Sequence, residues 1–271
     1  MNPSWYYSEF HLETFMKRYD GGYIMKKHFA IMGILMILFA LTAWPADYSL
    51  KSGEHEGKGY LLLGSGTLGI GKLNDRLSDN GYSRFSDNFF SIGGGGHGVI
   101  RRLIIGGEGF AFTSSDNEAI KSGKPYKTSL VGGCGFFNLG YTVFRKNTFS
   151  IYPLFGIGGG GFALSITDRT TASFSDVLSN PGRSSQLSSG ALLLSASLGA
   201  DYLVSPHQEM RDGRRGGLLL GFRFGYMFAP VKSNWNLDNL EVFGGPKTGI
   251  TGPFFHFMIG GGGIAPARTR G

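Results

Sequence analysis

The stretch GLLLGFRFGYMFAP, residues 217–230, carries one charged residue, Arg223, in a run of leucine, phenylalanine, tyrosine and glycine. In an α-helix, Arg223 would lie in the middle of an apolar cylinder. With a period of two, the run separates into two faces, because successive side chains of a β-strand point to opposite sides. One face holds Leu218, Leu220, Phe222, Phe224, Tyr226 and Phe228, and the other holds Leu219, Gly221, Arg223, Gly225 and Met227. The stretch therefore predicts a strand with one large apolar face and one face of small residues around a single charge.

Similar stretches, rich in apolar residues and glycine, recur along the chain in eight segments. We expect these segments to be strands: residues 59–72, 88–98, 102–114, 128–144, 148–166, 190–205, 216–230 and 252–265. Glycine accounts for 46 of the 271 residues, and helices of this length would not carry so much glycine. The connections between the segments broadly alternate between long and short, which predicts an antiparallel up-and-down meander. Closing such a sheet into a barrel removes its unpaired edges.

The composition limits the class of protein. Apolar residues make up 41% of the chain and lie in runs, which argues against disorder. Cys134 is the only cysteine, so the sequence offers neither a disulfide within the chain nor a cysteine-based metal site. The net charge of +7 is modest and the Lys and Arg residues are scattered, so we expect no nucleic-acid partner.

The N-terminal part has the order of a secretory signal peptide. From Met25 the chain reads Lys26 and Lys27, then an apolar run of 16 residues from 29 to 44, then small residues up to Ala46. That run is shorter than the roughly 20 residues of a membrane-spanning helix, and an uncleaved anchor helix is the alternative. We therefore expect five parts: an extension upstream of the true start (1–24), a signal peptide (25–46), a short N-terminal segment (47–58), the barrel (59–265) and a basic tail (266–271).

A few polar residues interrupt the predicted strands. The charged ones are Glu108, Asp201 and Arg223, and Asn138 and His256 accompany them. An arginine facing lipid at mid-bilayer would cost about 2–4 kcal/mol, whereas charges that point inward can pair. We expect a structural polar network inside the barrel, with Glu108 and Asp201 paired to Arg223.

Motifs that would indicate chemistry are weak. The tract GGGGHG, residues 93–98, fits a phosphate-binding glycine pattern, but no helix is expected after it and no GK[ST] occurs. Of the histidines, only His256 falls near the long connections, where Ser129 or Ser165 could accompany it in a hydrolase. The sequence shows no cluster of metal ligands. We expect no catalytic, cofactor-binding or metal-binding residues.

These features together resemble the eight-stranded bacterial outer-membrane β-barrels, such as the OmpA transmembrane domain and OmpX, over about residues 59–265. The resemblance implies an all-β fold, an eight-stranded antiparallel up-and-down transmembrane β-barrel, with short periplasmic turns and long extracellular loops. It also implies export to the cell outer membrane. The partners that it implies are outer-membrane lipids, the barrel-assembly machinery and an extracellular ligand of the long loops.

The function predicted from the sequence is a structural, adhesion or interaction role, or that of a narrow pore, without enzymatic activity. Two alternatives stay open. One is an outer-membrane lipid-modifying enzyme. The other is a secreted lipocalin-like barrel, in which the large residues would surround a ligand. The second face of the strands favours the membrane barrel, because it holds glycine, serine and single charges, as in a narrow barrel filled by its own side chains.

Overall fold

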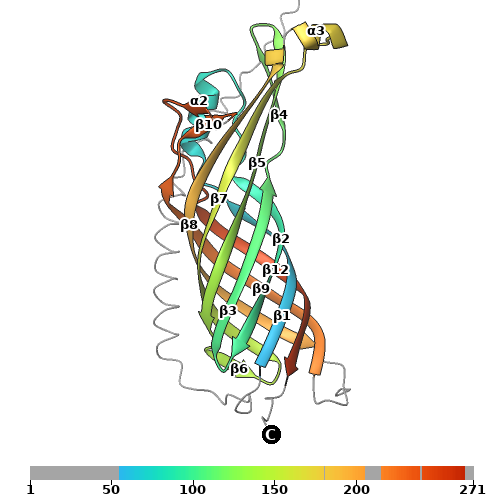
Figure 1. Cartoon of the computed structure of the whole chain (residues 1–271), viewed down its shortest axis with the longest axis vertical. Coiled ribbons are helices and arrows are strands. Elements are labelled where there is room, and N and C mark those ends of the chain that lie inside the picture. Colours follow the sequence, from blue (N-terminus) through green and yellow to red (C-terminus); the bar gives the residue numbers. More distant parts are fainter. Residues whose placement is uncertain (1–54, 180, 205–214, 239, 266–271) are drawn as a thin grey trace, which may run out of the picture. The chain divides into compact units, whose positions relative to one another are not determined.

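Eight long strands close into a barrel, each paired antiparallel with the next. In order they are β1 (His55–Thr67), β2 (Asn88–Ile100), β3 (Leu103–Thr113), β5 (Lys124–Tyr141), β7 (Phe149–Asp168), β8 (Ser184–Val204), β9 (Arg215–Lys232) and β12 (Gly252–Ala265). In the computed structural model β12 pairs with β1, which completes the ring (Figure 1). The predicted fold class is confirmed, and each of the eight predicted segments corresponds to one of these strands.

The structure describes residues 55–179, 181–204, 215–238 and 240–265. The predicted N-terminal extension, signal peptide and basic tail lie outside these residues, as does most of the segment 47–58. Within the described residues, no helix is both long enough and apolar enough to cross a bilayer.

The long connections carry small elements of their own. These are α2 (Gly71–Asp79), β4 (Asn117–Lys121), α3 (Phe174–Ser179), the 3-10 turn η2 (Pro181–Arg183), β10 (Trp235–Leu237) and β11 (Leu240–Val242), while β6 (Phe144–Lys146) lies in a short connection. The prediction that the first strand runs to residue 72 was wrong, because β1 ends at Thr67 and Gly71 begins α2. Leu73 and Leu77, one helical turn apart, are buried on one side of this helix.

The two faces of each strand are separated as the alternation predicts. On β9, Leu218, Phe222 and Phe228 are exposed on the outside, whereas Leu219 and Met227 are fully buried. A lipocalin-like barrel would need polar side chains on the outside, where they would face water. The chain is therefore a transmembrane β-barrel, with a lipid-facing apolar exterior.

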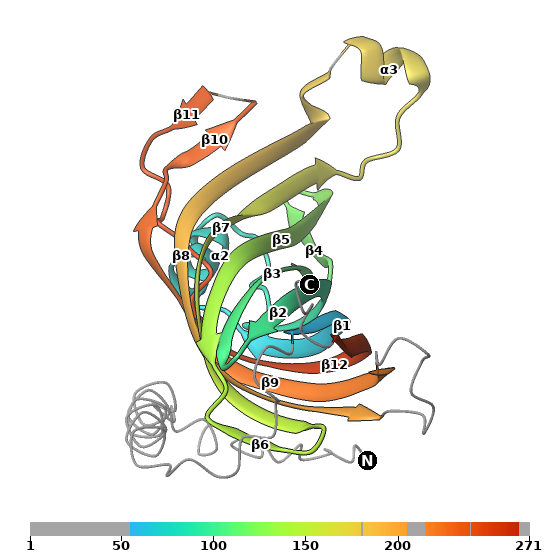
Figure 2. The same cartoon turned by 60° about the horizontal axis from the view of Figure 1, so that its bottom comes forward.

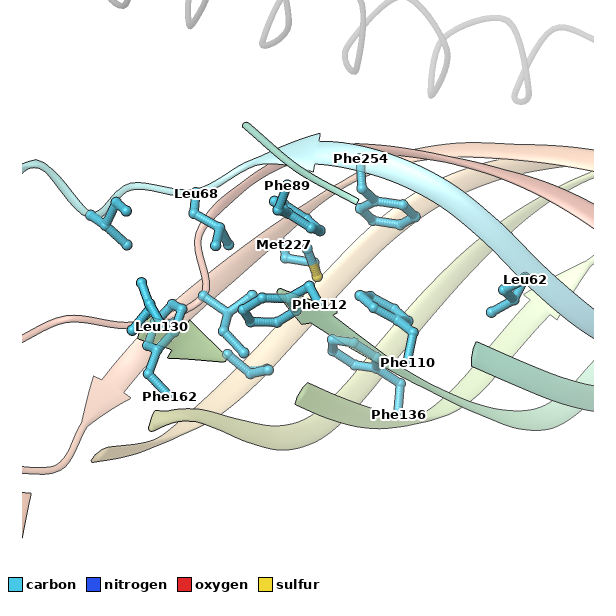
Figure 3. Close-up of a cluster of buried hydrophobic side chains, with 14 of the residues drawn as sticks. Leu62, Leu68, Phe89, Phe110, Phe112, Leu130, Phe136, Phe162, Met227 and Phe254 are labelled. Atoms are coloured by element: carbon cyan, nitrogen blue, oxygen red, sulfur yellow. The ribbon is translucent and has the colours of Figure 1, made fainter. Parts of the chain in front are cut away.

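The half of the interior towards the long connections is packed with apolar side chains (Figure 3). Its members come from opposite walls and include Phe89, Phe110, Phe112, Phe136, Phe162, Met227 and Phe254. Leu73 and Leu77 of α2 belong to the same cluster, so this helix closes the long-loop end of the barrel. Buried Asn74 of α2 fixes the returning chain, because its side chain donates to the oxygen of Phe85 and accepts from its nitrogen, both at 2.9 Å. Burial raises the pKa of the nearby Asp87 carboxyl, although Arg84 acts in the opposite direction.

Three strands continue past the rim of the barrel (Figures 1 and 2). β5, β7 and β8 have 18, 20 and 21 residues, against the roughly 9–11 that a membrane-spanning strand needs. Beyond the rim, β4 pairs with β5 and β10 pairs with β8, while β11 extends β10. The result is an open antiparallel sheet on the long-loop side.

Candidate functional site

Arg223 lies at the centre of the interior. It projects inward from β9 with no exposed surface, between the outward-facing Phe222 and Phe224. Its guanidinium forms an ion pair with Glu108, which projects from β3 on the opposite wall. It also donates to the Tyr60 hydroxyl at 3.1 Å, and its Cζ lies 5.5 Å from the centre of the Tyr60 ring, within cation–π range. The charge is therefore met by an anion, a hydroxyl and an aromatic face.

Asp201 belongs to a different group from Arg223. Its two carboxylate oxygens accept from Lys58 Nζ at 2.8 Å and from the Tyr152 hydroxyl at 2.7 Å. We expected Asp201 to pair with Arg223, but its ion pair is with Lys58. The reason is the register: Asp201 lies opposite Gly221 on β9, two residues away from Arg223 and nearer the short turns.

A second ion pair joins this group at the short-turn end. Glu56 lies 3.1 Å from Lys58 Nζ, and it accepts from Arg145 Nη1 at 2.7 Å. Sequence reasoning missed these three residues, because Glu56 and Lys58 fell in the expected N-terminal segment and Arg145 in an expected turn. A signal was available in the alternation of Glu56, Lys58, Tyr60 and Leu62 with glycine and leucine.

His256 and Asn138 are the remaining predicted interior residues, and both are buried. His256 Nε2 lies 2.9 Å from Ser91 Oγ, and its ring packs between Phe110 and Phe254 at centroid distances of 4.6 and 5.0 Å. Its Nδ1, like the Asn138 side-chain nitrogen, has no hydrogen-bond partner among the described residues. Buried polar atoms of this kind are commonly satisfied by internal water.

The Ser91–His256 contact does not form a catalytic triad. Both side chains are completely buried beneath the apolar cluster, and no carboxylate in the described part of the chain orients His256 through Nδ1. Ser129 and Ser165, the other serines considered for a hydrolase, lie opposite each other in the β5–β7 register. Both flank inward-facing leucines and so point outward, away from His256.

His97 is a further interior residue that the sequence analysis placed only at the short-turn end. Its Nδ1 lies 3.4 Å from the Tyr60 hydroxyl, and its ring packs edge-on against Tyr152 at 5.6 Å. It therefore lies between the Arg223 pair and the Asp201 group. The tract of residues 93–98 that contains it is part of β2, paired on both sides. In the described ranges no group of three or more His, Cys, Asp or Glu residues could hold a metal ion.

The charges of the interior balance. The cations Lys58, Arg145 and Arg223 face the anions Glu56, Glu108 and Asp201, and all six are buried. Below the apolar cluster the barrel is therefore filled by neutralised ion pairs, and such pairs depend on both partners because an unpaired buried charge is costly.

No family model and no curated protein sequence matches the chain. Among solved structures, it is similar to Ail, the attachment invasion locus protein of Yersinia pestis, at 13% identity and a TM-score of 0.33, with 79% of this chain and 99% of that chain covered. It is similar to Neisserial surface protein A at 14% identity and a TM-score of 0.32, with coverages of 78% and 98%. It is also similar to the outer membrane protein AlkL at 11% identity and a TM-score of 0.30, with coverages of 84% and 97%. The fold assignment rests on the strand pairing of this chain itself.

Proposed function

We propose that the chain is an outer-membrane barrel, exported by the predicted signal peptide of residues 25–46, that holds a structural or adhesive surface outside the cell. The observation that carries this proposal is the filled interior. Most of the apolar cluster lies in the long-loop half, the Arg223–Glu108 pair lies in the middle, and the Lys58–Asp201 group lies in the short-turn half. Narrow eight-stranded barrels have interiors just wide enough for side chains to fill, so a permanently open pore is not the function that we propose.

The long-loop end supports an interaction role because it exposes large apolar side chains. Phe174 of α3 is 81% exposed, Phe243 after β11 is 87% exposed, and Ile120, Leu178 and Leu240 are similarly uncovered. Charges in the same region pair with one another, as in Lys127–Asp116 at 2.7 Å and Arg84–Asp75 at 2.9 Å. Exposed apolar side chains mark contact surfaces where they gather into a patch. We infer that contacts there are made mainly through apolar groups.

A catalytic role is not part of this proposal. The one Ser–His contact described above is sealed from both ends of the barrel, and a nucleophile has to reach its substrate. The lipid-modifying enzyme considered from the sequence has no accessible group in the described residues that favours it.

Two experiments test the proposed function. In planar bilayers, the purified full chain should give no steady ion conductance, because the interior is filled. A stable open conductance at low voltage would contradict a structural role and favour the narrow pore.

The adhesive role is tested on cells. Cells displaying the full chain should adhere to polystyrene beads, and a variant carrying Phe174→Ser, Leu178→Ser, Leu240→Ser and Phe243→Ser should lose this adherence. Ser175→Ala, on the same exposed helix, should not change it. Equal adherence of the unaltered chain, the four-serine variant and Ser175→Ala, at equal surface expression, would contradict the adhesive role.

A further inference from the structure

Charge is distributed unevenly between the two ends of the barrel. At the short-turn end, the β2–β3 turn consists of Arg101 and Arg102, and the next short connection, residues 142–148, carries Lys146. Neither connection contains an acidic residue. At the long-loop end, by contrast, basic side chains pair with acidic ones on the surface. The short-turn end therefore presents positive charge that its own sequence does not cancel.

Arg101 and Lys146 are the cations of this end that face outward. Both are exposed, and neither forms an ion pair with an acidic group in the described part of the chain. Arg145 differs, because it turns into the barrel and pairs with Glu56. In the described ranges, the acidic residues at this end are Glu56 and Asp201, and both are buried in the interior ion pairs. We call Arg101 and Lys146 the basic rim.

The two connections that carry the basic rim lie side by side (Figure 1). Leu103 of β3 pairs with Tyr141 of β5, and the Thr142 backbone nitrogen donates to the Arg102 carbonyl oxygen at 2.8 Å. Arg101 has a left-handed backbone, with φ of 59°, so a tight turn fixes the place from which its side chain leaves the barrel. Both cations therefore belong to one part of the short-turn edge.

The outer face next to the basic rim has the residues of a membrane interface. Tyr141 and Tyr202 are about half exposed at the short-turn ends of β5 and β8. Aromatic girdles mark the level of the lipid headgroups in outer-membrane barrels. Ile100 and Leu103, which flank the β2–β3 turn, are also about half exposed and continue the apolar exterior up to Arg101. The charges thus follow directly on the apolar band, at the level where lipids carry their phosphates.

We propose that the basic rim binds the phosphate groups of anionic phospholipids in the leaflet that faces the short turns. The Arg101 guanidinium donates to the phosphate oxygens, for which its planar fork is suited, and the Lys146 ammonium adds a second positive charge. Insertion into a membrane alone predicts contact with lipid but no preference among headgroups, and this preference is what the basic rim adds. The inference rests on the placement in the proposed function, which makes this the inner leaflet, but not on the adhesive role.

Native mass spectrometry tests the proposal with the full chain in mild detergent, offered equal amounts of phosphatidylglycerol and phosphatidylethanolamine. The unaltered chain should retain more phosphatidylglycerol, whose headgroup is anionic. Arg101→Asn/Lys146→Gln should lower this preference by about fivefold for each charge removed, the order that one basic residue contributes at an anionic surface. Asparagine suits position 101 because it adopts a left-handed backbone more readily than most residues. Migration in SDS before heating checks that each variant is folded.

The matched control is Lys72→Gln/Arg76→Gln, which removes two exposed charges from α2 at the other end of the barrel. This variant should keep the preference of the unaltered chain. The preference should also weaken as the concentration of ammonium acetate is raised, because exposed charges are screened by salt.

Four outcomes would overturn the proposal. An unaltered chain without preference at low salt would contradict it directly, and an undiminished preference in the rim variant would place lipid selection elsewhere. An equal loss in the α2 control would assign the effect to net charge. A stronger preference for lipid A that the rim variant abolishes would place the basic rim in the outer leaflet. None of these readouts depends on conductance or cell adherence, so the two proposals can fail separately.

Discussion

Arg223 shows how one residue can be buried by the geometry of its strand. Its neighbours Phe222 and Phe224 face the outside, and the alternation of the strand then turns the guanidinium inward. Gly221 and Gly225 flank Arg223 on the inner face, and their missing side chains could be thought to make room for it. The nearest atoms to a Cβ at those positions belong instead to Ala200, Met258, Ser197 and other neighbours, all within 3 Å. The flanking glycines therefore make room for the adjoining strands.

We expect Arg223→Ala to lower the free energy of unfolding by about 3–5 kcal/mol, because Glu108 would stay buried without its cation. Urea unfolding of the full chain in lipid vesicles measures this loss. Arg169→Ala, at an exposed loop position, is the control and should change stability by less than about 0.5 kcal/mol. The double variant Arg223→Met/Glu108→Leu should recover most of the stability, since apolar residues then replace both charges. Unchanged unfolding of Arg223→Ala would mean that water reaches the charge.

The interior residues could be predicted individually from the sequence, but their partners could not. Alternation within a strand is enough to place Glu108, Asp201 and Arg223 on the inner face. The partner of each depends on how far the strands are staggered around the closed barrel, which a single strand does not reveal. Lys58 reaches Asp201 from a strand that is not its neighbour, so no local pattern connects the two.

At the scale of the strand, glycine has two different uses. In the sequence, the high glycine content served only as an argument against helices. Inside the barrel, however, glycines lie beside large side chains of the neighbouring strand: a Cβ at Gly199 would lie 2.4 Å from the Tyr152 ring, and one at Gly132 would lie 2.3 Å from Phe112. On the outside, a Cβ at Gly135 would meet nothing closer than 3.8 Å. Inner glycines are thus required by packing, whereas outer ones shape the wall.

This difference predicts unequal effects of the same substitution. Gly199→Ala should destabilise the barrel by about 1–3 kcal/mol, because Tyr152 is fully buried, is held by Asp201 and cannot yield to an added methyl group. Gly135→Ala should be nearly neutral or slightly stabilising, since alanine also restricts the unfolded chain. Thermal unfolding of both variants in the same detergent compares them. A greater loss for Gly135→Ala would contradict the assignment of inner and outer faces.

The eight strands were predictable because a period of two is clear in several of them, although it is weaker in the glycine-rich segments 59–72 and 88–98. The elements of the long connections were not predictable in this way. α2 shows only two leucines one turn apart, Leu73 and Leu77, and its other residues are polar. Tertiary contact with the barrel's apolar cluster buries these leucines, and a short helix in isolation would be marginal. β10 likewise depends on pairing with β8 beyond the rim. Such elements are fixed by neighbours that are distant in the sequence.

At the scale of the whole molecule, the lengths of the connections predict its orientation. In a Cys134→Ala background, a cysteine at Ser175, exposed on α3, should react with a membrane-impermeant thiol reagent on intact cells. A cysteine at Lys146, exposed beside a short turn, should react only after the outer membrane is permeabilised. The reverse pattern would place the long connections in the periplasm.

The closed ring and the apolar exterior together predict how the folded chain behaves in detergent. Every strand of the ring is paired on both sides, so no edge is open to disruption by SDS. On the outside, residues such as Phe155, Ile157 and Phe222 are about half exposed, and in water they would drive aggregation. The chain should therefore require detergent to stay dispersed, and in SDS it should migrate differently before and after boiling.

Gly199→Ala should lower the temperature at which this change in migration occurs, whereas Gly135→Ala should not. Recovery of the folded barrel as a monomer in plain buffer would contradict the membrane placement.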